Sequence, residues 1–103
     1  MKHCILLLTC ANQKEAEKIS QILLEKKLVV CIKTASVRSS FLWHKKINHA
    51  SEVLLIMDSV ERNFDKIKEE VKKIHSYETF VLTSSLVNKT TPEVEKWIEE
   101  ELL

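Results

Sequence analysis

Glycine is absent from the 103-residue sequence, and Pro92 is its single proline. Phosphate-binding loops and dinucleotide-binding turns use glycine where the backbone must approach a ligand closely or adopt a positive φ. We therefore expect no nucleotide cofactor.

An acylphosphatase-like enzyme of similar size would need a glycine-bearing anion loop and a positioned arginine. Residues 11–13, after the first expected strand, contain no glycine, and Arg38 and Arg62 are the only arginines. The sequence predicts a binding protein and not an enzyme.

A bias in charge and a long apolar run are also missing. The 16 basic and 15 acidic residues are interleaved and leave a net charge of +1, so nothing resembles the basic stripe that binds nucleic acid. No segment reaches the roughly 20 apolar residues of a membrane helix, and the run at 4–8 is too short for a signal peptide. We expect no membrane or nucleic-acid partner.

Cysteine usage points to the compartment. Cys4, Cys10 and Cys31 are odd in number and lie in apolar or strand-like surroundings. Reduced thiols are the simplest interpretation, which predicts a cytoplasmic protein.

With 45% hydrophobic and 30% charged residues, the chain is predicted to fold as one domain over residues 1–103. Because so short a chain buries only roughly 60–65% of its surface, oligomerisation would add stability.

Residues 4 to about 27 predict a strand followed by a helix. Residues 4–10 form a continuous apolar run, as in a strand that is covered on both faces. Asn12 can cap the following helix, and Glu15 can complete a capping box. Apolar residues then recur at helical spacing to about Lys27, at Ala16, Ile19, Ile22 and Leu23.

A long hairpin is expected next. Residues 28–32 read as a buried strand that continues past a polar break at 34–36 into 40–43. A turn around His44 and Lys45 leads to the returning strand, which runs to residue 57. This hairpin is longer than one small domain can cover, so we expect its outer part to pair with another subunit.

The remaining elements complete an α+β pattern. Phe64, Ile67, Val71 and Ile74 mark a second amphipathic helix, and residues 80–87 give a fourth strand. Thr91 as cap and Pro92 at the first helical position begin a C-terminal helix. The order βαββαβ predicts a ferredoxin-like sandwich with a long hairpin between its second and third strands and an extra C-terminal helix.

Several ordered segments resemble the divalent-cation-tolerance (CutA) family. They are residues 9–16 (TCANQKEA), 24–31 (LEKKLVVC), 37–39 with 43–47, 51–56, 75–78 (HSYE) and 94–98. The resemblance covers essentially the whole chain. This chain departs from the family at Ser76, where a proline is usual, and at Leu8 and Ile74, where some members have a cysteine and a second histidine proposed to bind metal.

The resemblance implies a ferredoxin-like protomer in a homotrimer, linked to tolerance of divalent metals, above all copper, without catalysis. It also implies an alternative, because the trimer resembles PII-type signalling proteins that bind small ligands between subunits. The positions that line the intersubunit cleft in the family correspond here to Trp43, Lys46, Glu52, His75, Tyr77 and Glu78.

Two residues are candidates for holding a metal. The thiolate of Cys10 and the imidazole of His75 suit copper or zinc. We expect them at opposite ends of the subunit, so that a shared site needs a neighbouring chain. The alternative is a buried thiol and a helix-ending imidazole without a metal. A free amino terminus with His3 in third position could also wrap Cu(II), unless strand formation removes that backbone.

Overall fold

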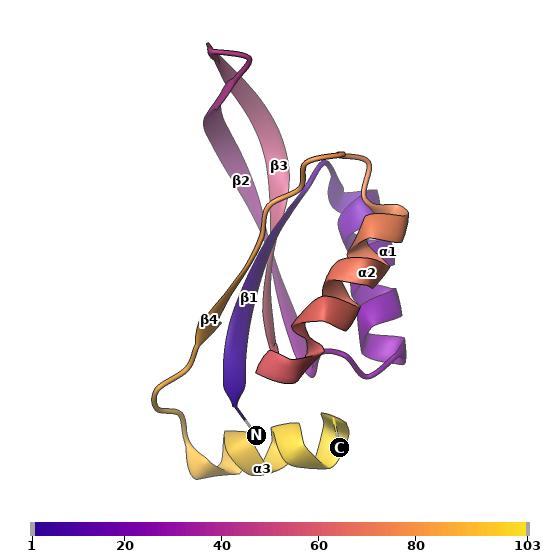
Figure 1. Ribbon diagram of the computed structural model, residues 1–103, viewed down its shortest axis with the longest axis vertical. Coiled ribbons are helices and arrows are strands. Elements are labelled where there is room, and N and C mark those ends of the chain that lie inside the picture. The colour runs from indigo at the N-terminus through magenta and orange to yellow at the C-terminus, as the bar shows by residue number, and fades with distance from the viewer. Residues whose placement is uncertain (1, 103) are drawn as a thin grey trace.

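The computed structural model describes residues 2–102 and contains a βαββαβ core followed by a helix (Figure 1). The strands form one antiparallel sheet in the order β2-β3-β1-β4, and α1 and α2 cover one of its faces. The predicted ferredoxin-like α+β fold is confirmed. The elements are β1 (His3–Cys10), α1 (Gln13–Glu25), β2 (Cys31–Trp43), β3 (Lys46–Val60), the 3-10 turn η1 (Glu61–Asn63), α2 (Phe64–Ile74), β4 (Leu82–Leu86) and α3 (Pro92–Leu102).

Strand β1 lies in the middle of the core but is covered on one face only. Its side chains at Cys4, Leu6, Leu8 and Cys10 are fully buried. The alternate side chains of Ile5 and Leu7 remain 37% and 40% exposed. The expectation that this strand is covered on both faces is therefore wrong for a single chain, because both packed helices lie on the same side of the sheet (Figure 1).

The start of α1 follows the predicted cap, with one difference. The Asn12 side chain accepts a hydrogen bond from the Glu15 amide at 2.9 Å, as expected for an N-cap. Glu15 does not close the capping box on Asn12. Its carboxylate reaches one residue further and accepts from the Ala11 amide at 2.8 Å. The Glu15 carboxylate therefore lies beside the end of β1, where it becomes part of the site described below.

Helix α1 ends in a Schellman motif without glycine. The Leu28 amide donates to Leu23 at 2.9 Å, and the Lys27 amide donates to Leu24 at 3.0 Å. Lys27 therefore occupies the position that helices usually give to glycine, and its φ is +56°. A side chain in this left-handed region costs about 1 kcal/mol or more.

Replacing this lysine should stabilise the protein. We expect Lys27→Gly to raise the free energy of unfolding by about 1 kcal/mol, because glycine adopts a positive φ without steric cost. Lys18→Gly, at an exposed position in the middle of α1, is the matched control and should lower it by about 1 kcal/mol. Chemical denaturation of the three proteins at one protein concentration measures both effects. Equal destabilisation by the two glycines would show that Lys27 carries no strain.

The hairpin differs from the prediction at the outer ends of its two strands, because β2 begins later and β3 runs on to Val60 instead of residue 57. Strand β2 begins at Cys31 and not at residue 28, and it continues past the polar residues 34–36 as predicted, since these residues pair in register with 53–55 of β3. Leu28 instead lies in the loop before β2, where its carbonyl accepts from Ser59 and from Asn63 at 3.2 Å. Strand β4 likewise begins two residues later than predicted, at Leu82.

The tip of the hairpin combines strain with exposed apolar side chains. His44 and Lys45 form the predicted turn with φ of +50° and +63°, values that two-residue hairpin loops usually assign to asparagine and glycine. Leu42 and Ile47 lie directly opposite each other and are 73% and 72% exposed. Beside them, Phe41 and Trp43 are also exposed.

The hairpin gives the chain an extended shape, because it projects beyond the helices and the other strands (Figure 1). The radius of gyration is 14.3 Å, against about 12.8 Å for a compact domain of this length. The accessible surface is 7081 Å², against about 6,000 Å² for a compact monomer of this mass. None of the described helices is both long and apolar enough to cross a membrane.

Candidate metal and ligand site

Cys10, Glu15 and His75 lie together within one chain. One ligand atom of each lies within 4.8 Å of the others. Cys10 ends β1, Glu15 is in the first turn of α1, and His75 caps the end of α2. The expectation that Cys10 and His75 lie at opposite ends of the subunit is wrong. β1 and α2 run in the same direction in this fold, so their carboxyl ends meet at one end of the sheet (Figure 1).

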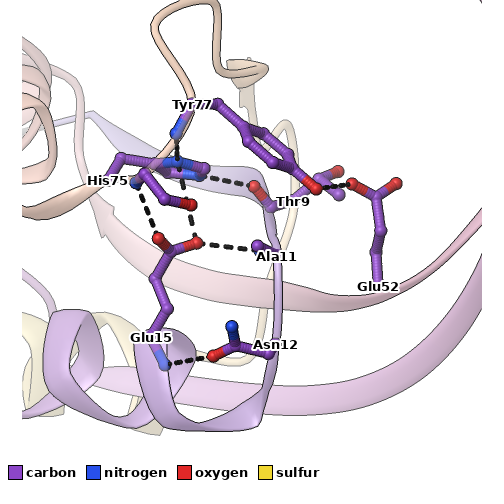
Figure 2. Close-up of polar contacts among 8 residues, drawn as sticks. Thr9, Ala11, Asn12, Glu15, Glu52, His75 and Tyr77 are labelled. Carbon is purple, nitrogen blue, oxygen red and sulfur yellow. Dashed lines mark hydrogen bonds and ion pairs between the residues drawn. The ribbon is translucent and has the colours of Figure 1, made fainter.

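Both ring nitrogens of His75 have hydrogen-bond partners (Figure 2). Its Nε2 donates to the Thr9 carbonyl at 2.8 Å, and its Nδ1 accepts from the Tyr77 amide at 3.0 Å. These partners place the proton on Nε2 and a lone pair on Nδ1. The side chain is fully buried, and its ring stacks on that of Phe80 at a centroid distance of 5.2 Å.

Glu15 joins three segments of the chain. Besides the Ala11 amide, its carboxylate accepts from the Ser76 amide at 2.7 Å, and one oxygen lies 3.7 Å from His75 Nδ1 (Figure 2). Burial acts to raise the pKa of Glu15, but the hydrogen bonds from Ala11 and Ser76 and the nearby His75 outweigh it, so this pKa lies below its usual value.

This carboxylate should make stability depend on pH. A carboxyl group whose pKa is lower in the folded state stabilises the protein above the unfolded pKa of about 4.3, and the contribution disappears as pH falls through the folded value. We expect the loss of unfolding free energy between pH 7 and pH 3 to be smaller in Glu15→Gln than in the unsubstituted protein. Glu17→Gln is the control. Glu17 lies two residues further along α1 and is exposed, so its substitution should leave that loss of unfolding free energy unchanged.

Cys10 is a protonated thiol at neutral pH. The residue is fully buried, and burial, with smaller contributions from Glu15 and Glu52, raises the pKa of Cys10 to about 12. All three cysteines are free, as predicted. A metal bound by Cys10 must therefore displace a proton before the sulfur becomes a ligand.

The donor set and its surroundings fit a divalent transition metal. Sulfur, imidazole nitrogen and carboxylate oxygen are the ligand types of zinc and copper sites, and three protein ligands leave a fourth position for water. The 3.7 Å between His75 Nδ1 and Glu15 is close to the roughly 3.4 Å that separates neighbouring ligands in a tetrahedral site. The bond from Nε2 to the Thr9 carbonyl is the outer contact that metal-ligating histidines typically make. Binding at Nδ1 costs the hydrogen bond from Tyr77.

A second polar contact connects this cluster with the hairpin. The Tyr77 hydroxyl donates to a Glu52 carboxylate oxygen at 2.6 Å (Figure 2). The hydrogen bond to Glu52, together with burial, raises the pKa of Tyr77 to about 12. Glu52 belongs to β3 and is only 8% exposed. The loop after α2 is thus tied both to the end of β1, through His75, and to the base of the hairpin.

The six predicted cleft residues divide into two groups. His75, Tyr77 and Glu52 lie together at the base of the hairpin. Trp43 and Lys46 face each other across its tip, about 20 Å along β3 from Glu52. Glu78 lies in the exposed loop after α2. A cleft that contains all six therefore requires a second chain.

Sequence reasoning missed Glu15 as a member of the site, because the capping pattern already gave this residue a role. The amino-terminal copper motif is also affected by the structure. Met1 lies outside the described residues, while His3 is part of β1 and its Nε2 contacts Asp58 at 2.9 Å. This nitrogen of the ring is thus engaged elsewhere.

Comparison with known protein families gives a match over nearly the whole chain. The family model described as CutA1 divalent ion tolerance protein matches residues 4–101. The chain belongs to the CutA1 family. A divalent-cation tolerance protein CutA of Archaeoglobus fulgidus is 34% identical over 98 residues, which are 95% of this chain and 96% of that protein.

Solved CutA structures have the same fold. The structure of the periplasmic divalent cation tolerance protein CutA from Archaeoglobus fulgidus superposes with a TM-score of 0.96 at 33% identity, over 98% of this chain and 99% of that one. CutA1 from Oryza sativa, at 19% identity, reaches a TM-score of 0.96 over 100% and 95% of the two chains and supports the fold alone. The CutA resemblance is thus confirmed, and these comparisons give no support to the PII-type alternative.

Proposed function

We propose that this CutA chain binds copper or another divalent transition metal at Cys10, Glu15 and His75, and that it contributes to the response to metal ions without catalysing a reaction. The observation that supports this most is the convergence of the three ligand atoms within 4.8 Å. Membership in a family named for divalent-ion tolerance points in the same direction. The proposed site forms within one subunit, and its buried position favours slow exchange of the bound metal.

Two buried cysteines in β1 allow a matched test. Cys10→Ala should lower the affinity for Zn(II), a redox-inactive probe, by at least about tenfold, because it removes the sulfur ligand. Cys4→Ala, equally buried in the same strand and on the same face, should leave the affinity unchanged. Isothermal titration calorimetry of the three proteins measures both. Equal affinities in all three would refute Cys10 as a ligand.

The same titration should depend on pH in a defined direction. The Cys10 thiol loses its proton on binding, and its pKa of about 12 lies far above neutral pH. The apparent affinity should therefore rise about tenfold for each pH unit between pH 6 and 8, with close to one proton released for each metal bound. An affinity that is constant across this range contradicts a thiolate ligand.

We further propose that the chain functions as a homotrimer joined through the hairpin. Assembly is favoured by the exposed apolar side chains of Leu42 and Ile47 at the tip and by the face of β1 that no helix covers. The accessible surface, which is large for a monomer of this mass, favours it as well. In such a trimer, Trp43 and Lys46 of one subunit can complete a cleft with Glu52, His75, Tyr77 and Glu78 of another, so that a small ligand could bind next to the metal site.

We place the protein in the cytoplasm, on the basis of its three free thiols. The Archaeoglobus fulgidus protein is named as periplasmic, which differs from this assignment. Fractionation of the source cells followed by immunodetection of the chain tests it, and recovery in the periplasmic or secreted fraction would overturn it.

A further inference from the structure

The loop after α2 supplies two consecutive backbone donors to the proposed metal ligands. The Ser76 amide donates to a Glu15 carboxylate oxygen at 2.7 Å. The Tyr77 amide donates to His75 Nδ1 at 3.0 Å (Figure 2). A carboxylate has several lone pairs and can hold a metal while it keeps such a partner, but Nδ1 has a single lone pair. A metal at His75 must therefore replace the Tyr77 amide, whereas the Ser76 amide can stay.

Tyr77 is also fixed through its side chain. Its hydroxyl donates to Glu52 on β3 at 2.6 Å, and its ring centroid lies 5.0 Å from that of His75 (Figure 2). A hydrogen bond to a carboxylate is roughly twice as strong as one between neutral groups. The amide on Nδ1 and the hydroxyl on Glu52 belong to one residue, so each contact helps to hold the other in place.

The ligand side chains are closed off from solvent while Tyr77 holds this position. The side chains of Cys10 and His75 are fully buried, and that of Glu15 is 9% exposed. Tyr77 is 36% exposed and lies in the segment without regular structure between α2 and β4. Movement of Tyr77 therefore disrupts no helix or strand, and water can hydrate its released amide and hydroxyl.

We propose that Tyr77 is a latch on the metal site, an inference that rests on the function proposed above. Metal binding at His75 displaces the Tyr77 amide and releases the hydroxyl from Glu52, so that metal occupancy is transmitted to the base of the hairpin. The coupling is reciprocal, and whatever loosens the contact between Tyr77 and Glu52 tightens metal binding. Only molecules with an open latch can take up metal, which weakens the apparent affinity in proportion to their fraction.

Tyr77→Phe should raise the affinity for Zn(II) by about tenfold in calorimetric titration, because it removes the hydroxyl contact and keeps the backbone amide. In a Glu52→Gln background, where this contact is already weakened, Tyr77→Phe should raise the affinity much less, since the two side chains act as a pair. Thr79→Val is the control. It removes an exposed hydroxyl two residues further along the same loop and should bind zinc like the unsubstituted chain.

Raman spectroscopy observes the latch directly, because Tyr77 is the only tyrosine in the chain. The intensity ratio of the tyrosine doublet distinguishes a hydroxyl that donates strongly to a carboxylate from a hydrated hydroxyl. We expect the ratio of a strong donor in the metal-free chain, and a change to that of a hydrated hydroxyl once zinc is bound. Glu52→Gln should shift the ratio of the metal-free chain in the same direction.

These measurements separate a failure of the latch from a failure of the metal site. Zinc that binds more weakly to Cys10→Ala, but leaves the doublet of the unsubstituted chain unchanged, would overturn the latch alone. Equal or weaker zinc binding in Tyr77→Phe would do the same. If the unsubstituted chain binds no zinc, or if Cys10→Ala binds it equally well, the latch and the proposed function are both wrong.

Discussion

The double substitution Leu42→Glu with Ile47→Lys should convert the proposed trimer into a monomer. These side chains are directly opposite each other at the hairpin tip and are 73% and 72% exposed in the single chain. Burial of a leucine or isoleucine in an interface stabilises it by about 1.5–3 kcal/mol, and three hairpins would contribute. The substituted pair replaces this apolar contact with two charges that must be desolvated.

The substitution is designed to spare the hairpin itself. Glutamate and lysine directly opposite each other on neighbouring strands attract, so the ladder between β2 and β3 should remain. Native mass spectrometry or sedimentation should give three times 12.0 kDa for the unsubstituted chain and 12.0 kDa for the variant. Leu24→Glu, at an apolar position on α1 that is 42% exposed, is the control and should stay trimeric. A monomeric unsubstituted chain, or a trimeric double variant, contradicts assembly through the tip.

His75→Ala should destabilise the fold by about 3 kcal/mol or more, which is the largest effect expected for any single site residue. The side chain is fully buried, so its removal leaves a cavity next to Phe80. It also leaves the partly buried Thr9 carbonyl without its partner, which costs about 1–3 kcal/mol, whereas water can replace the exposed hydrogen bond from the Tyr77 amide.

Chemical denaturation at fixed protein concentration measures this loss, because the stability of an oligomer depends on concentration. His49→Ala is the control. That histidine is exposed, and the hydrogen bond of its ring to Ser40, at 2.8 Å, is exposed as well, so its removal should change stability by less than about 0.5 kcal/mol. Similar small losses in both variants would mean that the network around His75 contributes little to the fold.

The sequence predicted the elements well because local signals determine them. Asn12 as a cap, the helical spacing of α1 and α2, and the turn at His44 and Lys45 each depend on neighbouring residues, and each is present. The predicted continuation of β2 through the polar residues 34–36 has a non-local cause. These small residues remain in strand β2 because β3 supplies a continuous partner strand.

The site was predictable in composition but not in arrangement. Cys10 and His75 were identified as ligand types, but their 65-residue separation gave no indication that β1 and α2 end at the same place. Glu15 was interpreted as a capping residue, and only the path of the loop after α2 brings the Ser76 amide to its carboxylate. The division of the cleft residues between the base and the tip of the hairpin likewise depends on how β2 and β3 extend beyond the sheet.

X-ray absorption spectroscopy of the protein loaded with one Zn(II) per chain tests the proposed metal site most directly. We expect one sulfur ligand at about 2.3 Å together with nitrogen and oxygen ligands at about 2.0–2.2 Å. The sulfur contribution should be lost in Cys10→Ala and retained in Cys4→Ala. A spectrum that contains only nitrogen and oxygen ligands in the unsubstituted protein would contradict a site built on Cys10, Glu15 and His75.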